Sequence, residues 1–360
     1  MAGFDMLRHL DIFAREPGLF IDGNLKFKSK TGAIFTFVYF LVILSIVFIE
    51  LRSYVNTSSP VTATDMFRQF VYPRVNLSQN KIVPALVVYT DDSTLLSLSD
   101  YSTYFTLAAY QVKWAERETE NPDEQNNQDA EKFLNKIDLI PCSELHQKNP
   151  DVFDYYYKPN SMHNYSRELV MSFGMCIDAT DPRFVVSGQA TDDLWEQITI
   201  YIRPCATEIG KTCAADADVE KVNFVFITPR KSYNSANMDQ PIEYVPNFGD
   251  IFYLSKHSMQ LYTVNIAETK VMDYTGTLPK WVTRVDYFDI ESSSLILAGR
   301  GTSQITCLST DAKNVQDELA CPSYFKYTLQ SSGAMHINKR TYMTLFDILS
   351  SIGGINGILM

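Results

Sequence analysis

Hydrophobic and polar positions divide the chain into an early apolar stretch, a long mixed segment and a second apolar stretch at the end. No residue from Ala33 to Ile49 carries a charge. A helix of about 20 residues spans the roughly 30 Å hydrocarbon core of a bilayer, whereas strands rarely exceed about ten residues. The length therefore predicts a transmembrane helix over residues 31–51. A buried core helix of a soluble protein is the alternative.

Alternation in the mixed segment, residues 52–340, predicts a mainly-β domain. In the clearest strand, Gln197–Arg203, three isoleucines alternate with Thr199, Tyr201 and Arg203 and should form a buried face. Further strands are expected at residues 70–75, 82–89, 101–114, 183–188, 222–228, 259–272, 282–289, 293–297 and 324–330. Short helices are expected at 129–139 and 311–319, with irregular structure between Cys142 and Cys176. This inventory predicts an antiparallel sandwich or curved sheets with few short helices.

The last apolar stretch, Ile348–Met360, is too short to span a bilayer. We expect residues 341–360 to begin a second transmembrane helix that the sequence does not complete; a segment that only dips into the membrane is the alternative. Gly353 and Gly357 have the small-xxx-small spacing that lets two helices approach closely in lipid. We expect these glycines to pack against the first helix or a neighbouring copy, unless they only kink or end the helix.

Lysines predict the orientation of the first helix. Lys26, Lys28 and Lys30 precede it, and positive charge close to a membrane helix marks the cytosolic side. We therefore expect residues 1–30 to form a cytosolic tail and residues 52–340 to be extracellular or lumenal. The first 30 residues are too polar for a cleavable signal peptide, so the helix is interpreted as an uncleaved signal anchor.

The charge and the aromatic content of the chain bear on its partners and on its core. The formal net charge is −11, and the juxtamembrane lysines are the only basic cluster, so nucleic acid is not an expected partner. Aromatic residues make up 13% of the chain, which is enough apolar area for a β-rich core.

All six cysteines follow the first helix, which predicts disulfides in an oxidising compartment. Six cysteines allow fifteen connectivities. We predict local pairs, and six reduced and buried thiols are the alternative. The predicted pairs are Cys142–Cys176, Cys205–Cys213 and Cys307–Cys321.

Three N-x-[ST] sequons lie in the segment expected outside the cytosol, at Asn56, Asn76 and Asn164. Asn56 is too close to the membrane helix for modification. We therefore predict a glycan on Asn164 first and on Asn76 second.

The sequence offers no catalytic motif. The five histidines are scattered, and neither HExxH nor GxSxG occurs. Gly210 and Lys211 do not form a phosphate-binding loop, because Cys205 stands where that loop needs a glycine. We expect no enzyme, no cofactor and no metal site.

Several segments resemble a known family: LDIF before the first helix, KTGA at its start, IPCSEL with CIDATD and ITIYIRPC in the middle, and RTYMTLFDILSSIGG at the end. Together they resemble a family of two-pass transmembrane proteins with a cysteine-bearing ectodomain, abundant in ciliates. Thr31, Gly32 and Ala33 depart from the double glycine of that pattern. The ends resemble more weakly the vesicle-cargo proteins of the ERGIC and Golgi, the Erv type, which implies a β-rich lumenal domain between two helices.

These observations favour a non-enzymatic integral membrane glycoprotein with a structural or protein-interaction role at the cell or ciliary surface. Its expected partners are membrane lipid and other membrane or extracellular proteins, including copies of itself in an oligomer. The Erv resemblance implies a cargo or sorting receptor of the early secretory pathway as an alternative. A subunit of a two-pass ion channel is a second alternative, because the topology is shared and Ser350, Ser351 and Asn356 are polar residues in the second helix.

Overall fold

The computed structural model describes residues 30–56, 61–69, 72–115, 131–157, 161–189, 192, 194–205, 212–234, 242–255, 257–275, 281–299, 322–342, 344, 346–347, 349–350 and 354. The chain divides into two compact units. One comprises residues 1–63, 271–284 and 339–360, and the other comprises residues 64–270 and 285–338.

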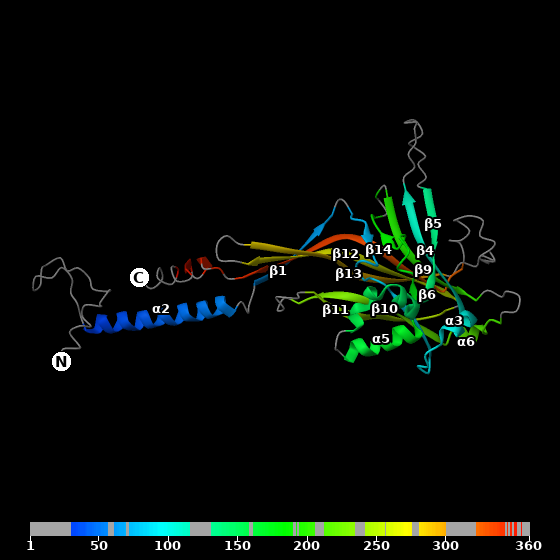
Figure 1. The fold of residues 1–360 in the computed structure, drawn as a ribbon, viewed down its shortest axis with the longest axis horizontal. Helices are drawn as coiled ribbons and strands as arrows, with labels where there is room; N and C mark the ends of the chain where they lie inside the picture. Colours follow the sequence, from blue (N-terminus) through cyan, green and yellow to red (C-terminus); the bar gives the residue numbers. More distant parts are fainter. Residues whose placement is uncertain are drawn as a thin grey trace, which may run out of the picture. The chain divides into compact units, whose positions relative to one another are not determined.

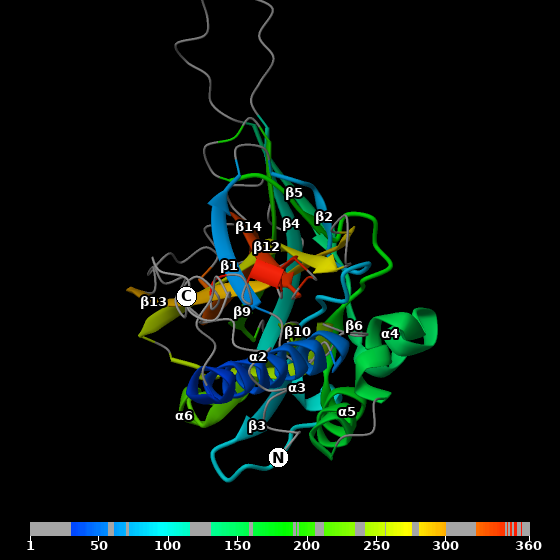
Figure 2. The ribbon, with the colours of Figure 1, turned by 90° about the vertical axis from the view of Figure 1, so that its left-hand side faces the viewer.

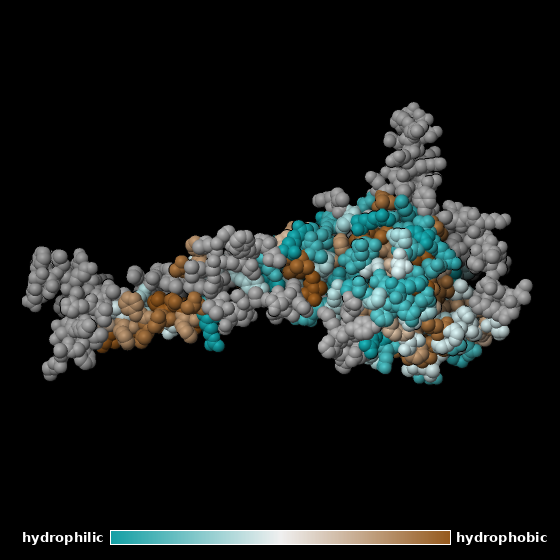
Figure 3. Space-filling view, in the orientation of Figure 1, coloured by the Kyte–Doolittle hydropathy of each residue, from teal (hydrophilic) through white to brown (hydrophobic). Residues whose placement is uncertain are grey.

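The first unit contains the long helix α2 (Lys30–Asn56), in which Thr31–Arg52 is apolar and long enough to cross a membrane. Large side chains along it are exposed, including Phe35, Leu44 and Phe48. Figure 3 shows the hydrophobic surface along this helix in brown. Thr36 and Ser45 donate their hydroxyl hydrogens to carbonyls one helical turn earlier, which satisfies these polar groups inside the helix. The predicted membrane-length helix is confirmed, and its exposure argues against a buried core helix.

The second apolar stretch begins as a helix. Thr344 and Asp347 form a capping box: the Thr344 backbone N–H donates to Asp347 Oδ2 at 2.7 Å, and the Asp347 N–H donates to Thr344 Oγ1 at 3.3 Å. Phe346, Leu349 and Ser350 are helical. The predicted start of a helix after residue 341 agrees with these residues, whereas Gly353 and Gly357 lie outside the described part of the chain.

Fourteen strands are described, and they form two large sheets and one small pair (Figure 1). The seven-stranded sheet has the order β13-β12-β14-β9-β4-β5, with β1 pairing β14. Its strands are β1 (Val61–Arg68), β4 (Phe105–Ala115), β5 (Glu131–Ile137), β9 (Leu194–Pro204), β12 (Ser258–Thr275), β13 (Trp281–Gly299) and β14 (Phe325–Thr341).

The second sheet is five-stranded and has the order β11-β10-β3-β7-β6. Its strands are β3 (Ala85–Thr90), β6 (Leu139–Pro141), β7 (Met175–Ile177), β10 (Val222–Tyr233) and β11 (Ile242–Tyr253), and β2 (Val75–Asn76) pairs β8 (Val185–Val186) separately. The pairs β10–β3, β10–β11, β4–β9 and β9–β14 are antiparallel. The predicted mainly-β fold is confirmed.

An aromatic core joins the two sheets into a sandwich. Phe224 of β10 lies with its ring centroid 4.8 Å from that of Phe325 of β14, and Phe226 lies 4.1 Å from Tyr327. Each fully buried apolar side chain contributes about 1.5–3 kcal/mol relative to an exposed one. The isoleucine face of β9 enters the same core, as its alternation predicts.

Short helices cover part of the second unit. They are α3 (Leu98–Tyr104), α4 (Cys142–Lys148), the 3-10 helix η3 (Pro150–Tyr157), α5 (Ser161–Phe173) and α6 (Asp216–Val219). Helices α4 and α5 pack together, as Figure 2 shows. The prediction of irregular structure between Cys142 and Cys176 was therefore wrong, because Leu145, Phe153 and Val170 bury apolar side chains from this helical segment.

Several other predicted helices and strands differ from those observed in the structure. Residues 131–137 form strand β5 instead of a helix, because they pair with β4. Residues 98–104 are helical, and the Tyr101 hydroxyl donates to the Phe173 carbonyl from a buried position. Within the predicted strand 70–75, residues 72–74 form no strand and Val75 begins β2. The predicted strands 282–289 and 293–297 are one strand, and β1 and β11 were not predicted. The predicted helix 311–319 falls outside the described ranges.

Candidate binding cleft

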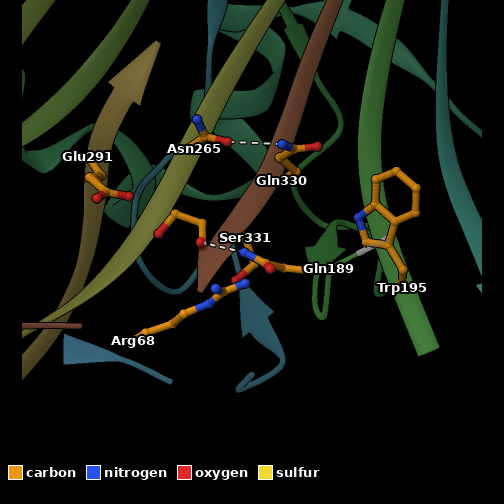
Figure 4. A pocket seen from close by; sticks show the side chains of 8 residues that line it. Arg68, Gln189, Trp195, Asn265, Glu291, Gln330 and Ser331 are labelled. Atoms are coloured by element: carbon orange, nitrogen blue, oxygen red, sulfur yellow. Dashed lines mark hydrogen bonds between the residues drawn. The ribbon is translucent and has the colours of Figure 1, made fainter. Parts of the chain in front are cut away.

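A polar cleft of about 510 Å³ lies within the second unit (Figure 4). This size is within the range of roughly 300–1,000 Å³ that is usual for ligand sites. The lining residues are Arg68, Gln189, Trp195, Asn265, Glu291, Gln330, Ser331 and Ser332.

Adjacent strands of the seven-stranded sheet bring these side chains together. Trp195 lies on β9, Asn265 on β12 and Gln330 on β14, and the sheet order places β14 between the other two. Because successive side chains of a strand point to opposite faces, Gln330 faces away from the core that Leu329 enters. The cleft therefore lies on the sheet face opposite the aromatic core.

Hydrogen bonds hold the amide side chains of the cleft in place. Gln330 Nε2 donates to Asn265 Oδ1 at 3.0 Å (Figure 4). Asn265 Nδ2 in turn donates to Ser292 Oγ at 3.0 Å. Gln189 Nε2 donates to the Ser332 carbonyl at 2.6 Å. A primary amide offers two donors and two acceptor lone pairs, so each retains capacity for a ligand beyond these bonds.

Trp195 supplies the aromatic surface of the cleft. Its ring stacks on Trp114, the residue opposite it on β4, with centroids 4.1 Å apart and planes 12° apart. The next residue, Glu196, points to the other sheet face and is 2% exposed. Its carboxylate accepts two bonds from Arg74 and others from Ser187 and Gln111. This network fixes the start of β9 and hence the position of Trp195.

A glycine permits the close approach of the cleft wall. Gly333 has φ +68°, a left-handed conformation that favours glycine. An added Cβ would lie 2.1 Å from Tyr72 Cε1 and 2.6 Å from Gln189 Nε2. Tyr72 in turn donates its hydroxyl hydrogen to Gln189 Oε1 at 3.2 Å. Gly333 is therefore required where Gln189 meets β14.

Both signs of charge border the cleft. Arg68 is exposed at the end of β1, and Glu291 Oε1 lies 3.5 Å from His336 Nε2. The lining therefore contains one guanidinium and one carboxylate among neutral amides and hydroxyls.

A second group of perturbed side chains lies between β10 and β13. The Lys231 backbone N–H donates to Asp289 Oδ1 at 2.8 Å, and Lys231 Nζ lies 5.5 Å and 5.7 Å from the ring centroids of Tyr287 and Tyr244. Burial raises the pKa of Asp289 to about 6 and lowers the pKa of Lys231 to about 8. Perturbed pKa values mark functional or structural sites alike, and these groups do not line the cleft.

The structure confirms two predicted disulfides. Cys142 pairs with Cys176 and Cys205 pairs with Cys213. The predicted Cys307–Cys321 pair lies outside the residues that the structure describes.

The predicted glycosylation residues lie on two different elements of the second unit. Asn76 ends β2, and its Oδ1 accepts a hydrogen bond from the Gln79 backbone N–H at 2.9 Å. Asn164 lies in α5. An N-linked glycan is attached to the side-chain nitrogen of asparagine. The hydrogen bond to Asn76 Oδ1 leaves that nitrogen available and is therefore compatible with glycosylation.

Sequence reasoning missed all the cleft residues. Trp195 is one of three tryptophans and stands just before the clearest predicted strand, which is the strongest local signal for it. Asn265 and Gln330 carry no such signal, because only the strand order brings them beside Trp195.

Together, the observed features define a mainly-β protein with a helix of membrane-spanning length and a polar cleft on one sheet. The chain belongs to the family described as uncharacterised 80 kDa protein N-terminal domain, whose family model matches residues 85–304, more than half of the chain. No curated protein matches the sequence.

Solved membrane proteins show a weak structural similarity. A proton-activated chloride channel matches with 8% identity and a TM-score of 0.28, covering 91% of this chain and 93% of the channel chain. Erv41p matches with 8% identity and a TM-score of 0.23, covering 74% of this chain and 98% of its own. TM-scores this low carry no argument about function. The resemblance to ciliate two-pass proteins stays a prediction.

Proposed function

We propose that this chain is a non-enzymatic integral membrane protein that binds a partner through the cleft of its β-rich domain. The observation that carries the proposal is the cleft itself: about 510 Å³, with amides already fixed by internal hydrogen bonds. Side chains that are ordered before binding lose less conformational entropy on binding, which favours a recognition site.

In this proposal α2 anchors the protein and the domain lies outside the cytosol. Lys26 and Lys28 before α2 and Lys30 at its first residue favour this orientation. The Cys142–Cys176 and Cys205–Cys213 disulfides favour an oxidising compartment. N-linked glycans on Asn164 and Asn76 belong to the same proposal.

The cleft favours two of the narrower hypotheses equally. A surface interaction protein and a cargo receptor both bind their partners through the domain outside the cytosol. A channel subunit would instead act through the second apolar stretch, whose polar residues Ser351 and Asn356 lie outside the described ranges. We therefore keep the channel as the weaker alternative.

Site-specific photo-crosslinking in intact cells tests the binding proposal. Benzoylphenylalanine replaces Trp195 in the cleft or, as the control, Tyr253, an aromatic residue of β11 that is 52% exposed and lies outside the cleft. We expect discrete adducts from position 195 that are absent at position 253 and that weaken when Gln330→Ala is added. Identical adducts at both positions, or adducts unaffected by Gln330→Ala, would contradict the proposal.

A further inference from the structure

We propose that the ligand of the cleft is a short, uncharged oligosaccharide. This inference rests on the proposed function and names the class of ligand that the same site takes. Three properties of the cleft support it: the hydrogen-bonding type of its side chains, its aromatic surface and its balance of charge.

The hydrogen-bonding groups match vicinal hydroxyls. Each sugar hydroxyl both donates and accepts, and a primary amide offers a donor and an acceptor side by side. Gln189, Asn265 and Gln330 present three such amides, each already held by a bond to the protein. Hydroxyls of adjacent ring carbons can therefore bridge an amide oxygen and an amide nitrogen without first ordering the side chain.

Trp195 supplies the complementary apolar contact. One face of a pyranose ring carries mostly C–H groups, whose hydrogens are weakly positive, and the face of an indole ring is weakly negative. The stack on Trp114 at 4.1 Å fixes the orientation of the Trp195 ring before a ligand arrives. An aromatic surface beside fixed amides distinguishes this cleft from a purely polar depression.

The charges favour an uncharged ligand. A phosphorylated or strongly acidic ligand needs several converging cations, whereas Arg68 is the one arginine or lysine among the residues lining this cleft. Glu291 offsets its charge and lies 3.5 Å from His336. The volume of about 510 Å³ suits a short oligosaccharide and excludes a folded partner from the interior of the cleft.

A glycan array probed with the purified full chain in detergent tests the inference. The array presents neutral oligosaccharides beside sialylated and sulfated ones. We expect binding to a subset of neutral glycans, which is then titrated by calorimetry. Trp195→Ala and Gln330→Ala should each weaken the affinity about tenfold or more, because each removes a direct contact. Tyr253→Ala, a matched exposed aromatic outside the cleft, should leave the affinity unchanged.

Three results would overturn the inference: no binding to any glycan, binding only to acidic glycans, or equal binding by wild type and both cleft variants. Because Trp195 packs on Trp114, the thermal transition of each variant is compared with that of wild type; if Trp195→Ala unfolds, Gln330→Ala and Asn265→Ala decide. Protein adducts from position 195 without glycan binding would overturn the glycan assignment and leave the proposed binding function intact.

Discussion

Two of the charged side chains buried in this fold are paired with hydrogen-bonding partners. Arg340 is fully buried and pairs with Asp273, and Glu196 is 2% exposed and accepts bonds from Arg74, Ser187 and Gln111. Removing one partner of such a group leaves an uncompensated buried charge, which costs several kcal/mol. These residues therefore fix strand positions more than they add net stability.

Asp289 should give the stability a distinctive pH dependence. Burial raises its pKa from 3.8 to about 6 in the folded protein. Between these values the folded state holds a proton that the unfolded chain releases, so the contribution of Asp289 to the free energy of unfolding falls as pH rises from about 4 to about 6. Urea unfolding of the full chain in detergent measures this change. The difference in the free energy of unfolding between wild type and Asp289→Asn should change by up to about 3 kcal/mol over this pH range.

The matched control for this experiment is Asp286→Asn, an exposed aspartate on the same strand. It should retain the wild-type dependence on pH. A difference between wild type and Asp289→Asn that stays constant from pH 4 to pH 7 would show that Asp289 does not titrate in this range.

Gly333 should be intolerant of substitution. Gly333→Ala forces a Cβ into Tyr72 and Gln189 at a positive φ, so we expect a loss of about 1–3 kcal/mol of stability together with weaker ligand binding. Thermal unfolding measures the first effect and calorimetry the second. Gly354→Ala is the control, because its Cβ meets no described atom within 4 Å. Equal melting temperatures for the two variants would refute the close approach.

At the scale of elements, local pattern predicted the strands that cross the core. Alternating isoleucines identified β9, and consecutive side chains along most of this strand are buried, so both of its faces are packed. Residues 131–137 have apolar spacing typical of a helix but form β5, because pairing with β4 overrides local preference. Strand β11 contains Pro246 and Gly249, which argue against a strand in sequence, and it lies at the edge of its sheet, where these residues are tolerated.

The cleft could not be predicted for a related reason. Its residues come from β9, β12 and β14, which are distant in sequence and adjacent only through the strand order. Nothing local marks Gln330 as a neighbour of Asn265. Two of the cysteine pairs, Cys142–Cys176 and Cys205–Cys213, were predictable because local pairing needs no knowledge of the sheets.

The two disulfides should differ in their contribution to stability. Cys142 and Cys176 are 34 residues apart and completely buried, whereas Cys205 and Cys213 are 8 apart and partly exposed. Loop entropy gives about 4 kcal/mol for the longer loop and about 2.5 kcal/mol for the shorter. Replacing Cys142 and Cys176 by alanine should therefore lower the melting temperature more than replacing Cys205 and Cys213. The opposite order would contradict this ranking.

At the scale of the whole molecule, one chain combines a membrane-length helix with a β-rich domain that carries a cleft. The helix exposes its apolar side chains, and the domain buries an aromatic core of its own. This combination agrees with the proposed function, in which the helix anchors the protein in the membrane and the domain binds the ligand.

Glycan attachment is expected on the domain. Treatment with an N-glycosidase should increase the gel mobility of the protein, and Asn164→Gln should remove more of that shift than Asn76→Gln. Asn56→Gln serves as the control, since Asn56 is the last residue of α2 and should carry no glycan. Unchanged mobility after enzyme treatment would count against a secretory route.

Protease protection in sealed vesicles tests most directly that α2 holds the cleft-bearing domain outside the cytosol. Vesicles with their cytosolic face outward are treated with protease, and the domain is detected by an antibody to it. We predict that a fragment containing residues 64–338 survives until detergent opens the vesicles, whereas an N-terminal tag is lost at once. Digestion of the domain in intact vesicles, with the N-terminal tag protected, would contradict the account.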